Sequence, residues 1–258
     1  MTIIQAIILG IVEGITEFLP ISSTGHLILI SRLFGISDSN FTKSFEIVIQ
    51  FGAILAVVVL YWKRLFSSKT TWKKVLTAFL PTAIIGFLLY KILKQYLLSN
   101  VAIVLWALFL GGVLLIVFEI WYKKKTDNQT SEINYKKSFL TGLAQSLAII
   151  PGVSRSGATI IGGLLMGISR QSIVEFSFLL AIPTMAAATG YDLLKSAGSF
   201  SFDQFYLLVL GFIISFIVAM LSIKWFIGYI KNHSFISFGI YRIIVALVFY
   251  ILIFQFKM

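Results

Sequence analysis

Long apolar runs separated by short polar stretches dominate the sequence. Six of these runs approach the length of about 20 residues that an α-helix needs to cross a bilayer. They lie at residues 43–62, 74–92, 100–122, 171–194, 203–225 and 236–256. The pattern predicts an all-α polytopic membrane protein with six transmembrane helices.

Two further apolar segments, 2–34 and 138–168, are each interrupted by a polar stretch around Pro20 and Pro151. Each interruption leaves two apolar arms that are too short to span a bilayer singly. We therefore predict two re-entrant helix–loop–helix hairpins, each entering and leaving by one face. Loop backbone is not tolerated against lipid, so both loops should be enclosed by protein or line a wet cavity.

Composition supports a lipid environment. The chain of 258 residues is 59% hydrophobic and 12% charged, whereas a soluble domain carries roughly 25% charged residues. The net charge of +11 comes from basic residues between the apolar runs, which argues against a nucleic-acid partner. The absence of cysteine, with only two histidines, excludes disulfides, thiol nucleophiles and multi-histidine metal clusters.

The basic residues also predict the orientation. The 63–74 loop and the 123–137 stretch are rich in lysine and arginine, which marks both as cytoplasmic. Two predicted spans separate them, so the layout is self-consistent. Counting from these loops places both termini on the extracytoplasmic side of the membrane.

The two halves of the chain resemble each other weakly. A shift of 132 residues pairs Gly10 with Gly142, Glu13 with Gln145, Ser22 with Ser154, Thr24 with Ser156 and Gly25 with Gly157. Each half has one hairpin followed by three spans, and an odd number of spans inverts the second half. We predict one integral membrane domain (1–258) with an inverted-topology repeat of 1–122 and 138–258, a linker at 123–137, and a site where the broken segments meet.

Glu13 and Glu17 are one helical turn apart, so both carboxylates lie on one face. Ionisable groups in apolar membrane segments are costly and commonly functional. Paired carboxylates suit a divalent cation such as Mg²⁺ or Ca²⁺, a type of ion that often bridges protein and phosphate oxygens. The alternatives are a shared proton, backbone capping, or contact with an arginine.

The first interruption continues with Ser22, Ser23, Thr24, Gly25 and His26. Hydroxyls beside a glycine at a helix start form an anion site. His26 follows Ser23 by three residues, so it is placed to reach that hydroxyl and activate it as a nucleophile. The alternative is helix capping by the hydroxyls, with His26 a satisfied core residue.

The second interruption supplies a cation. Arg155 lies between Ser154 and Ser156, with Gly157 and Thr159 following. A guanidinium binds phosphate oxygens through two parallel hydrogen bonds. The alternative is an ion pair with Glu13 or Glu17. Together the two interruptions indicate phosphoryl-transfer chemistry, which is mainly positioning and charge neutralisation.

The segments 13–26 and 151–159 resemble the two signature motifs of the BacA/UppP bacitracin-resistance family of bacterial undecaprenyl-diphosphatases, and the similarity covers essentially the whole chain. The resemblance implies cleavage of a C55 polyprenyl diphosphate to the monophosphate carrier lipid and inorganic phosphate. It identifies Glu13 and Glu17 with the acidic motif, Ser23 and His26 with the catalytic pair, and Arg155 with phosphate binding. Either Ser23 or His26 could attack phosphorus, and we favour Ser23 with His26 as acid and base.

Other functions remain open at this point. A lipid flippase or anion transporter would use the same inverted layout. The PAP2 type of membrane phosphatase needs a second histidine soon after the Ser-Arg pair, and none occurs before His233. Glu46 and Gln50 are expected to line the cavity. Arg242 could extend toward the lipid–water interface or face phosphate, and we favour the interface. The expected partners are the lipid substrate and membrane lipids, with a homodimer left open.

Overall fold

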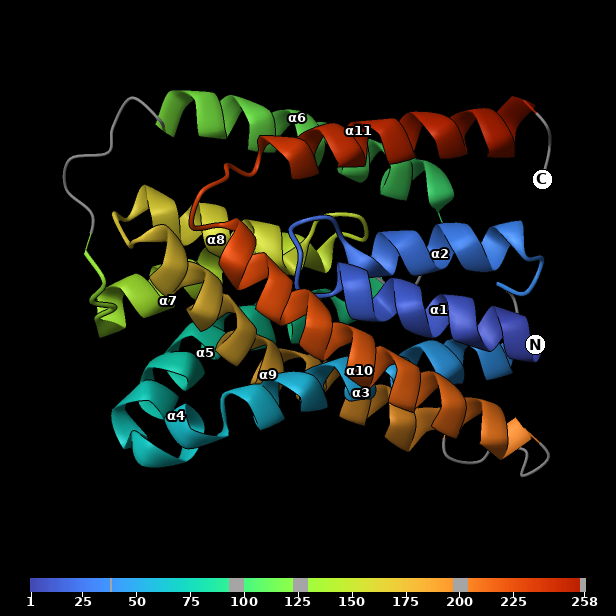
Figure 1. The fold of residues 1–258 in the computed structure, drawn as a ribbon, viewed down its shortest axis with the longest axis horizontal. Helices are drawn as coiled ribbons and strands as arrows, with labels where there is room; N and C mark the ends of the chain where they lie inside the picture. Colours follow the sequence, from blue (N-terminus) through green and yellow to red (C-terminus); the bar gives the residue numbers. More distant parts are fainter. Residues whose placement is uncertain (38, 93–99, 123–129, 197–203, 256–258) are drawn as a thin grey trace.

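The structure is a computed structural model that describes residues 1–37, 39–92, 100–122, 130–196 and 204–255. These residues form helices and no strand, although an isolated bridge pairs Thr130 with Ile168. The elements are α1 (Ile3–Thr16), α2 (Ser23–Leu33), α3 (Asn40–Leu60), α4 (Trp62–Ser67), α5 (Lys69–Ile92), α6 (Val101–Tyr122), α7 (Tyr135–Gln145), the 3₁₀ helix η3 (Ser146–Ile149), α8 (Arg155–Leu165), α9 (Arg170–Ser196), α10 (Phe205–Tyr229), α11 (Ile236–Tyr250) and the π-helical turn η6 (Ile251–Gln255) (Figure 1).

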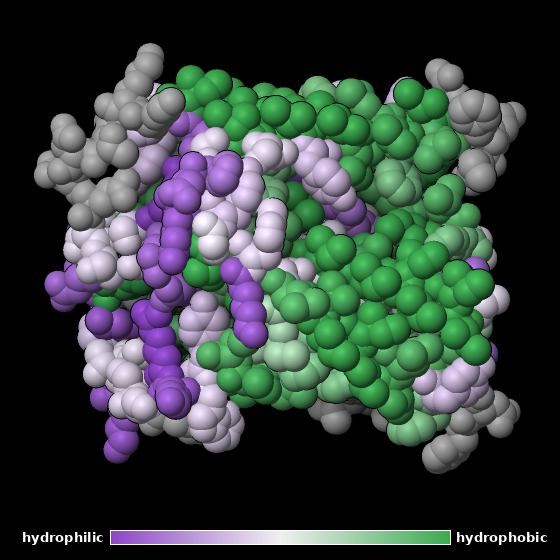
Figure 2. Space-filling model, in the orientation of Figure 1, coloured by the Kyte–Doolittle hydropathy of each residue, from purple (hydrophilic) through white to green (hydrophobic). Residues whose placement is uncertain are grey.

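Within the described ranges, five helical segments are long and apolar enough to cross a membrane: α3, α6, α10, Lys69–Leu89 of α5 and Ile236–Ile253 at α11. They fall in five of the six predicted spans, which confirms the all-helical polytopic membrane class. The sixth range, 171–194, lies within the single helix α9, which is not among the five. Exposed side chains such as Phe87 (80%) and Trp106 (63%) form the apolar exterior, which covers most of the face in Figure 2.

Both interrupted segments are helical hairpins in the structure. α1 enters from the end where the N-terminus is marked, and α2 returns toward the same end (Figure 1). α7 and α8 form a second hairpin from the opposite end, so the two turns meet in the interior (Figure 1). The turn at 17–22 separates α1 from α2, and residues 150–154 separate η3 from α8. The polar stretches therefore lie where the chain reverses.

Each hairpin packs against a long helix from the other half of the chain. α1 packs on α10, and α7 packs on α5. A Cβ at Gly14 of α1 would come within 2.8 Å of the Ser215 carbonyl oxygen, and one at Gly142 of α7 would overlap the Ala78 carbonyl. Small residues let the backbones of membrane helices approach this closely. The same kind of contact is thus made once by each hairpin.

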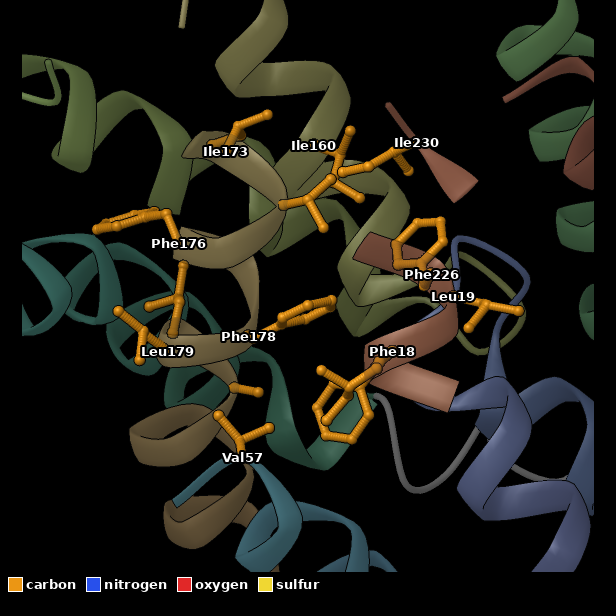
Figure 3. Close-up of a cluster of buried hydrophobic side chains, with 14 of the residues drawn as sticks. Phe18, Leu19, Val57, Ile160, Ile173, Phe176, Phe178, Leu179, Phe226 and Ile230 are labelled. Atoms are coloured by element: carbon orange, nitrogen blue, oxygen red, sulfur yellow. The ribbon is translucent and has the colours of Figure 1, made fainter. Parts of the chain in front are cut away.

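A buried aromatic cluster packs against Phe18 of the first turn (Figure 3). The Phe18 ring meets Phe178 of α9 edge-on at a centroid distance of 5.5 Å. Phe178 in turn lies 6.2 Å from Phe226 of α10. These rings are fully buried, and buried aromatic pairs are rigid as well as strongly apolar. The core therefore fixes the backbone at Phe18, directly beside Glu17.

Hydrophilic residues gather at the end of the molecule that carries α4 and the start of α7 (Figure 2). Arg170 at the start of α9 binds both carboxylate oxygens of Glu119 on α6, at 2.7 and 3.0 Å. Arg64 of α4 pairs with Glu175. Within the predicted linker, residues 123–129 lie outside the described residues. Its last three residues are helical, because Asn134 caps α7 by accepting from the Lys137 amide.

Candidate functional site

The first turn carries a strained backbone beside Ser23. Ser22 has φ 71° and ψ 90°, and it is the non-glycine residue with positive φ in the described part of the chain. Such a conformation costs about 1–3 kcal/mol and persists only where surrounding contacts hold it. The Ser22 hydroxyl accepts from the Gly25 amide at 3.3 Å and so caps α2. The predicted hydroxyls thus lie at a helix N-terminus.

The second turn is built in a similar way. Gly152 has φ 93°, a value that side chains rarely tolerate. Ser154 caps α8 by accepting from the Gly157 amide at 3.0 Å. Two hydroxyls then bind the first turn. Ser156, in α8, donates to the Phe18 carbonyl at 2.8 Å, and Ser154 of the second turn donates to the Leu19 carbonyl at 3.4 Å. The two predicted interruptions are therefore joined directly.

Glu17 joins the nucleophile candidate to the cation. One carboxylate oxygen of Glu17 accepts from the Ser23 hydroxyl. The other accepts from Arg155 Nη2 at 2.8 Å. The Glu17 and Arg155 side chains are only 6% and 13% exposed, so water screens this ion pair weakly. The structure brings three of the five candidate catalytic residues into one chain of contacts.

Arg155 is held in place with one donor left over. Its Nη1 donates to the Ser177 carbonyl at 2.7 Å, and its guanidinium lies 5.8 Å from the centre of the Phe18 ring. Its Nε is buried and has no hydrogen-bond partner. A buried unpaired donor on a cation is costly, and a phosphate oxygen is the ligand that would satisfy it.

Glu13 is completely buried, and neither of its carboxylate oxygens has a hydrogen-bond partner. It lies one helical turn before Glu17, on the same face of α1. An ionised carboxylate in such a place requires a cation, and a protonated one requires an acceptor. Among the described residues, no group of three or more His, Cys, Asp and Glu side chains could hold a metal ion.

Ser23 and His26 bind other partners, so the prediction of a hydrogen bond between them is wrong. His26 Nδ1 lies 2.8 Å from the Ser22 carbonyl oxygen, and Nε2 lies 3.0 Å from the Tyr241 hydroxyl. The imidazole is also stacked on the Tyr241 ring. Both ring nitrogens are thus engaged away from Ser23, whose hydroxyl turns back across the loop to Glu17.

The remaining candidates lie at different depths around this centre. The Thr159 hydroxyl donates to the Arg155 carbonyl at 2.8 Å and so secures α8. Thr24 is half-buried, and a Cβ at Gly25 would lie 3.5 Å from Gly152 Cα, so the turns touch there. Glu46 accepts from Ser31 at 2.5 Å and Gln50 is half-buried. The hydrogen bond of Glu46 therefore joins α3 to α2.

Arg242 is a residue whose place sequence reasoning missed. It was expected to extend toward the lipid–water interface, yet it is 3% exposed. Its guanidinium donates to backbone carbonyls of both turns, at Pro20 (3.3 Å) and Gly152 (3.0 Å). The one available signal was the glycine pair at 111–112 on α6, where a Cβ at Gly111 would overlap the guanidinium.

Comparison with known proteins identifies the family of the chain. A sequence model described as bacitracin resistance protein BacA matches residues 6–248. The chain belongs to the BacA family. The family predicted from the two motifs is thereby confirmed, over almost the whole length of the chain.

Several relatives of this BacA-family chain are similar along their full length, and each carries the name undecaprenyl-diphosphatase. A protein of Aquifex aeolicus is 55% identical over 96% of this chain and 98% of its own. One of a Sulfurihydrogenibium species is 53% identical over 97% and 99%. One of Bdellovibrio bacteriovorus is 52% identical over 98% and 97%. Both turns of the candidate site lie inside the matched length.

Proposed function

We propose that this chain hydrolyses undecaprenyl diphosphate to undecaprenyl phosphate and inorganic phosphate. The observation that carries the proposal is the chain of contacts from Ser23 through Glu17 to Arg155, in a protein whose relatives are named undecaprenyl-diphosphatase. The product is the carrier lipid for peptidoglycan and other cell-wall polymers. Recycling it accounts for a role in cell shape and in bacitracin resistance.

The Ser23 oxygen attacks the terminal phosphorus while its proton passes to Glu17. The bond from that phosphorus to the bridging oxygen breaks, and undecaprenyl phosphate leaves. Water then attacks the phosphorus of the phosphoserine, and the bond from phosphorus to the Ser23 oxygen breaks. Glu17 returns its proton to the Ser23 oxygen, and the protons of the water leave with inorganic phosphate. General-base help of this kind contributes about 10²–10⁴-fold in rate. In these steps the base is Glu17, to which the Ser23 hydroxyl donates, in place of the expected His26.

Arg155 supplies the charge that phosphoryl transfer requires. Its unpaired Nε is available to an oxygen of the terminal phosphoryl group, while the contacts to Glu17 and Ser177 hold the guanidinium still. The N-termini of α2 and α8 begin at the two turns, and helix N-termini attract anions. Preorganised charge of this kind stabilises the transition state without reorganisation.

Glu13 and Glu17 fit either a divalent cation or a shared proton, because both oxygens of Glu13 are buried without a partner. A Mg²⁺ or Ca²⁺ ion held there would neutralise the diphosphate and take its other ligands from substrate oxygens and water. With a cation bound, Glu13 keeps its negative charge beside Glu17. With a shared proton, Glu13 holds that proton beside Glu17. All these residues belong to one chain, so the proposal needs no second copy.

The membrane arrangement that we propose is six spans and two re-entrant hairpins in an inverted repeat. Its support is the matched packing of α1 on α10 and of α7 on α5, together with the packing of α3 on α9 and of α6 on α11. The hairpins enter from opposite ends, and η6 ends opposite α4 (Figure 1). With the basic end at α4 cytoplasmic, both termini are extracytoplasmic and the site opens between the halves.

Purified protein in detergent tests the proposal. Incubated with undecaprenyl diphosphate, it should form undecaprenyl phosphate and inorganic phosphate in equal amounts, and Ser23→Ala should form neither while eluting as a folded protein. Phosphate release by Ser23→Ala at the unsubstituted rate would contradict the nucleophile. Absence of release together with movement of the lipid across vesicle bilayers would favour the flippase alternative.

A further inference from the structure

The guanidinium of Arg242 is enclosed by four backbone carbonyls. Nε donates to Leu108 at 3.3 Å and Nη1 donates to Pro20 at 3.3 Å. Nη2 donates to Ala107 at 2.9 Å and to Gly152 at 3.0 Å. Four of the five N–H groups of an arginine are thus used. None of these contacts within the described residues involves a carboxylate, so the group is held by backbone alone.

The four carbonyls come from three separate parts of the chain. Pro20 belongs to the first turn and Gly152 to the second, while Ala107 and Leu108 lie on α6. Pro20 precedes Ser23 by three residues, and Gly152 precedes Arg155 by three residues. One side chain of α11 therefore connects the segment that carries the nucleophile to the segment that carries the phosphate ligand, and fixes both to α6.

Glycines make room for this arrangement. A Cβ at Gly111 would overlap Arg242 Nη2. A Cβ at Gly112 would lie 3.1 Å from Arg242 Cβ. At Gly152 a Cβ would come within 2.7 Å of the Val104 carbonyl oxygen. The guanidinium therefore lies in a slot between α6 and the second turn that has no space for an additional methyl group.

We propose that Arg242 is a positioning residue that holds the two turns in register, so that Ser23 and Arg155 meet the same phosphoryl group. This role rests on the proposed function. The direct bonds between the turns lie at Phe18 and Leu19, and Arg242 adds a third link at Pro20. A displacement of about 1 Å in a reacting group can lower a rate by roughly 100-fold.

An arginine suits this position because its planar fork directs several N–H groups outward from one rigid group. A lysine side chain is shorter and carries its three N–H donors on a single nitrogen. It therefore retains the charge but cannot bind all four carbonyls at once. Buried carbonyls left without donors are costly. The substitution Arg242→Lys therefore keeps the positive charge and removes the hydrogen bonds that connect the two turns.

The experiment compares two single variants, Arg242→Lys and Gly111→Ala, and their double variant. Gly111→Ala leaves Arg242 in place and crowds its guanidinium. Arg32→Lys is the matched arginine control, since Arg32 is exposed near the end of α2. Gly228→Ala is the glycine control, because a Cβ there meets nothing within 4 Å. Each variant is assayed for phosphate release and for the maleimide reactivity of a thiol introduced by Val153→Cys in this cysteine-free chain.

We expect Arg242→Lys and Gly111→Ala each to lower kcat by roughly 10- to 100-fold and to raise the thiol labelling rate severalfold, while both controls leave kcat and labelling unchanged. The double variant should lose little beyond either single variant, because both act on one contact. If Arg242→Lys does not fold, Gly111→Ala alone decides the matter.

Three results would overturn the proposal: full activity in Arg242→Lys, lost activity with unchanged labelling, or full activity in Gly111→Ala. Lost activity with unchanged labelling would instead indicate that the guanidinium donates directly to the phosphate, since both variants keep the positive charge. The labelling measurement does not depend on turnover. If the unsubstituted protein released no phosphate, the proposed function would fail while labelling still tested the link between the turns.

Discussion

The substitution Glu17→Gln separates the two duties that the structure gives to one carboxylate. The amide keeps the size of the side chain and an oxygen that can accept from Ser23 or Arg155. It cannot take up a proton, so Ser23 loses its general base. The expected fall in kcat is about 10²–10⁴-fold, which corresponds to about 2.7–5.4 kcal/mol in the activation barrier.

The same change leaves the buried Arg155 without its countercharge. Both side chains are less than one-seventh exposed, and removing one partner of such a pair costs about 3–5 kcal/mol. The melting temperature of Glu17→Gln should therefore fall. Added inorganic phosphate should recover part of the loss, because the anion can pair with the guanidinium in place of the carboxylate.

The assay is release of inorganic phosphate from undecaprenyl diphosphate by purified variants, with kcat and KM measured separately. Glu119→Gln is the matched control, because Glu119 is a buried carboxylate that also pairs with an arginine, Arg170, but has no contact with Ser23 or Arg155 among the described residues. It should keep kcat within a few-fold. A kcat for Glu17→Gln close to that of Glu119→Gln would refute the role of Glu17 as base.

Three further outcomes are expected. Arg155→Lys should lose most of its activity, since a point charge cannot reproduce the fork that binds Glu17 and leaves Nε for phosphate; an unchanged rate in the phosphate assay would indicate simple charge pairing. Chelation with excess EDTA should stop turnover if Glu13 and Glu17 hold a cation, and full activity would favour a shared proton. Gly152→Ala should lower the melting temperature and kcat together, because φ 93° disfavours a side chain; a melting curve identical to that of the unsubstituted protein would contradict this.

The helices and both hairpins could be predicted because membrane helices have a strong apolar signal and the two interruptions carry proline, glycine and hydroxyls together. The ends of the helices were less certain. α7 begins inside the predicted linker because Asn134 supplies a cap, and a cap depends on one residue rather than on a periodic pattern.

Two contacts at the site show where sequence reasoning stops. The spacing of Ser23 and His26 suggested a hydrogen bond within α2, but the Ser23 hydroxyl points across the turn to Glu17, a direction that the strained backbone at Ser22 sets. Arg242 binds backbone carbonyls, and carbonyls are present at every residue. The backbone carbonyls that Arg242 binds therefore cannot be recognised from the residue types in the sequence.

The most direct test of the central claim is a single-turnover experiment with enzyme in excess over undecaprenyl diphosphate. Samples are quenched in a cold, neutral, denaturing detergent, in which phosphoserine and phosphohistidine both survive, and the peptides are analysed by mass spectrometry. The account predicts a phosphoryl group on Ser23 that appears as undecaprenyl phosphate forms and decays as inorganic phosphate is released. Complete turnover with Ser23 never phosphorylated, or with the phosphoryl group on His26, would contradict it.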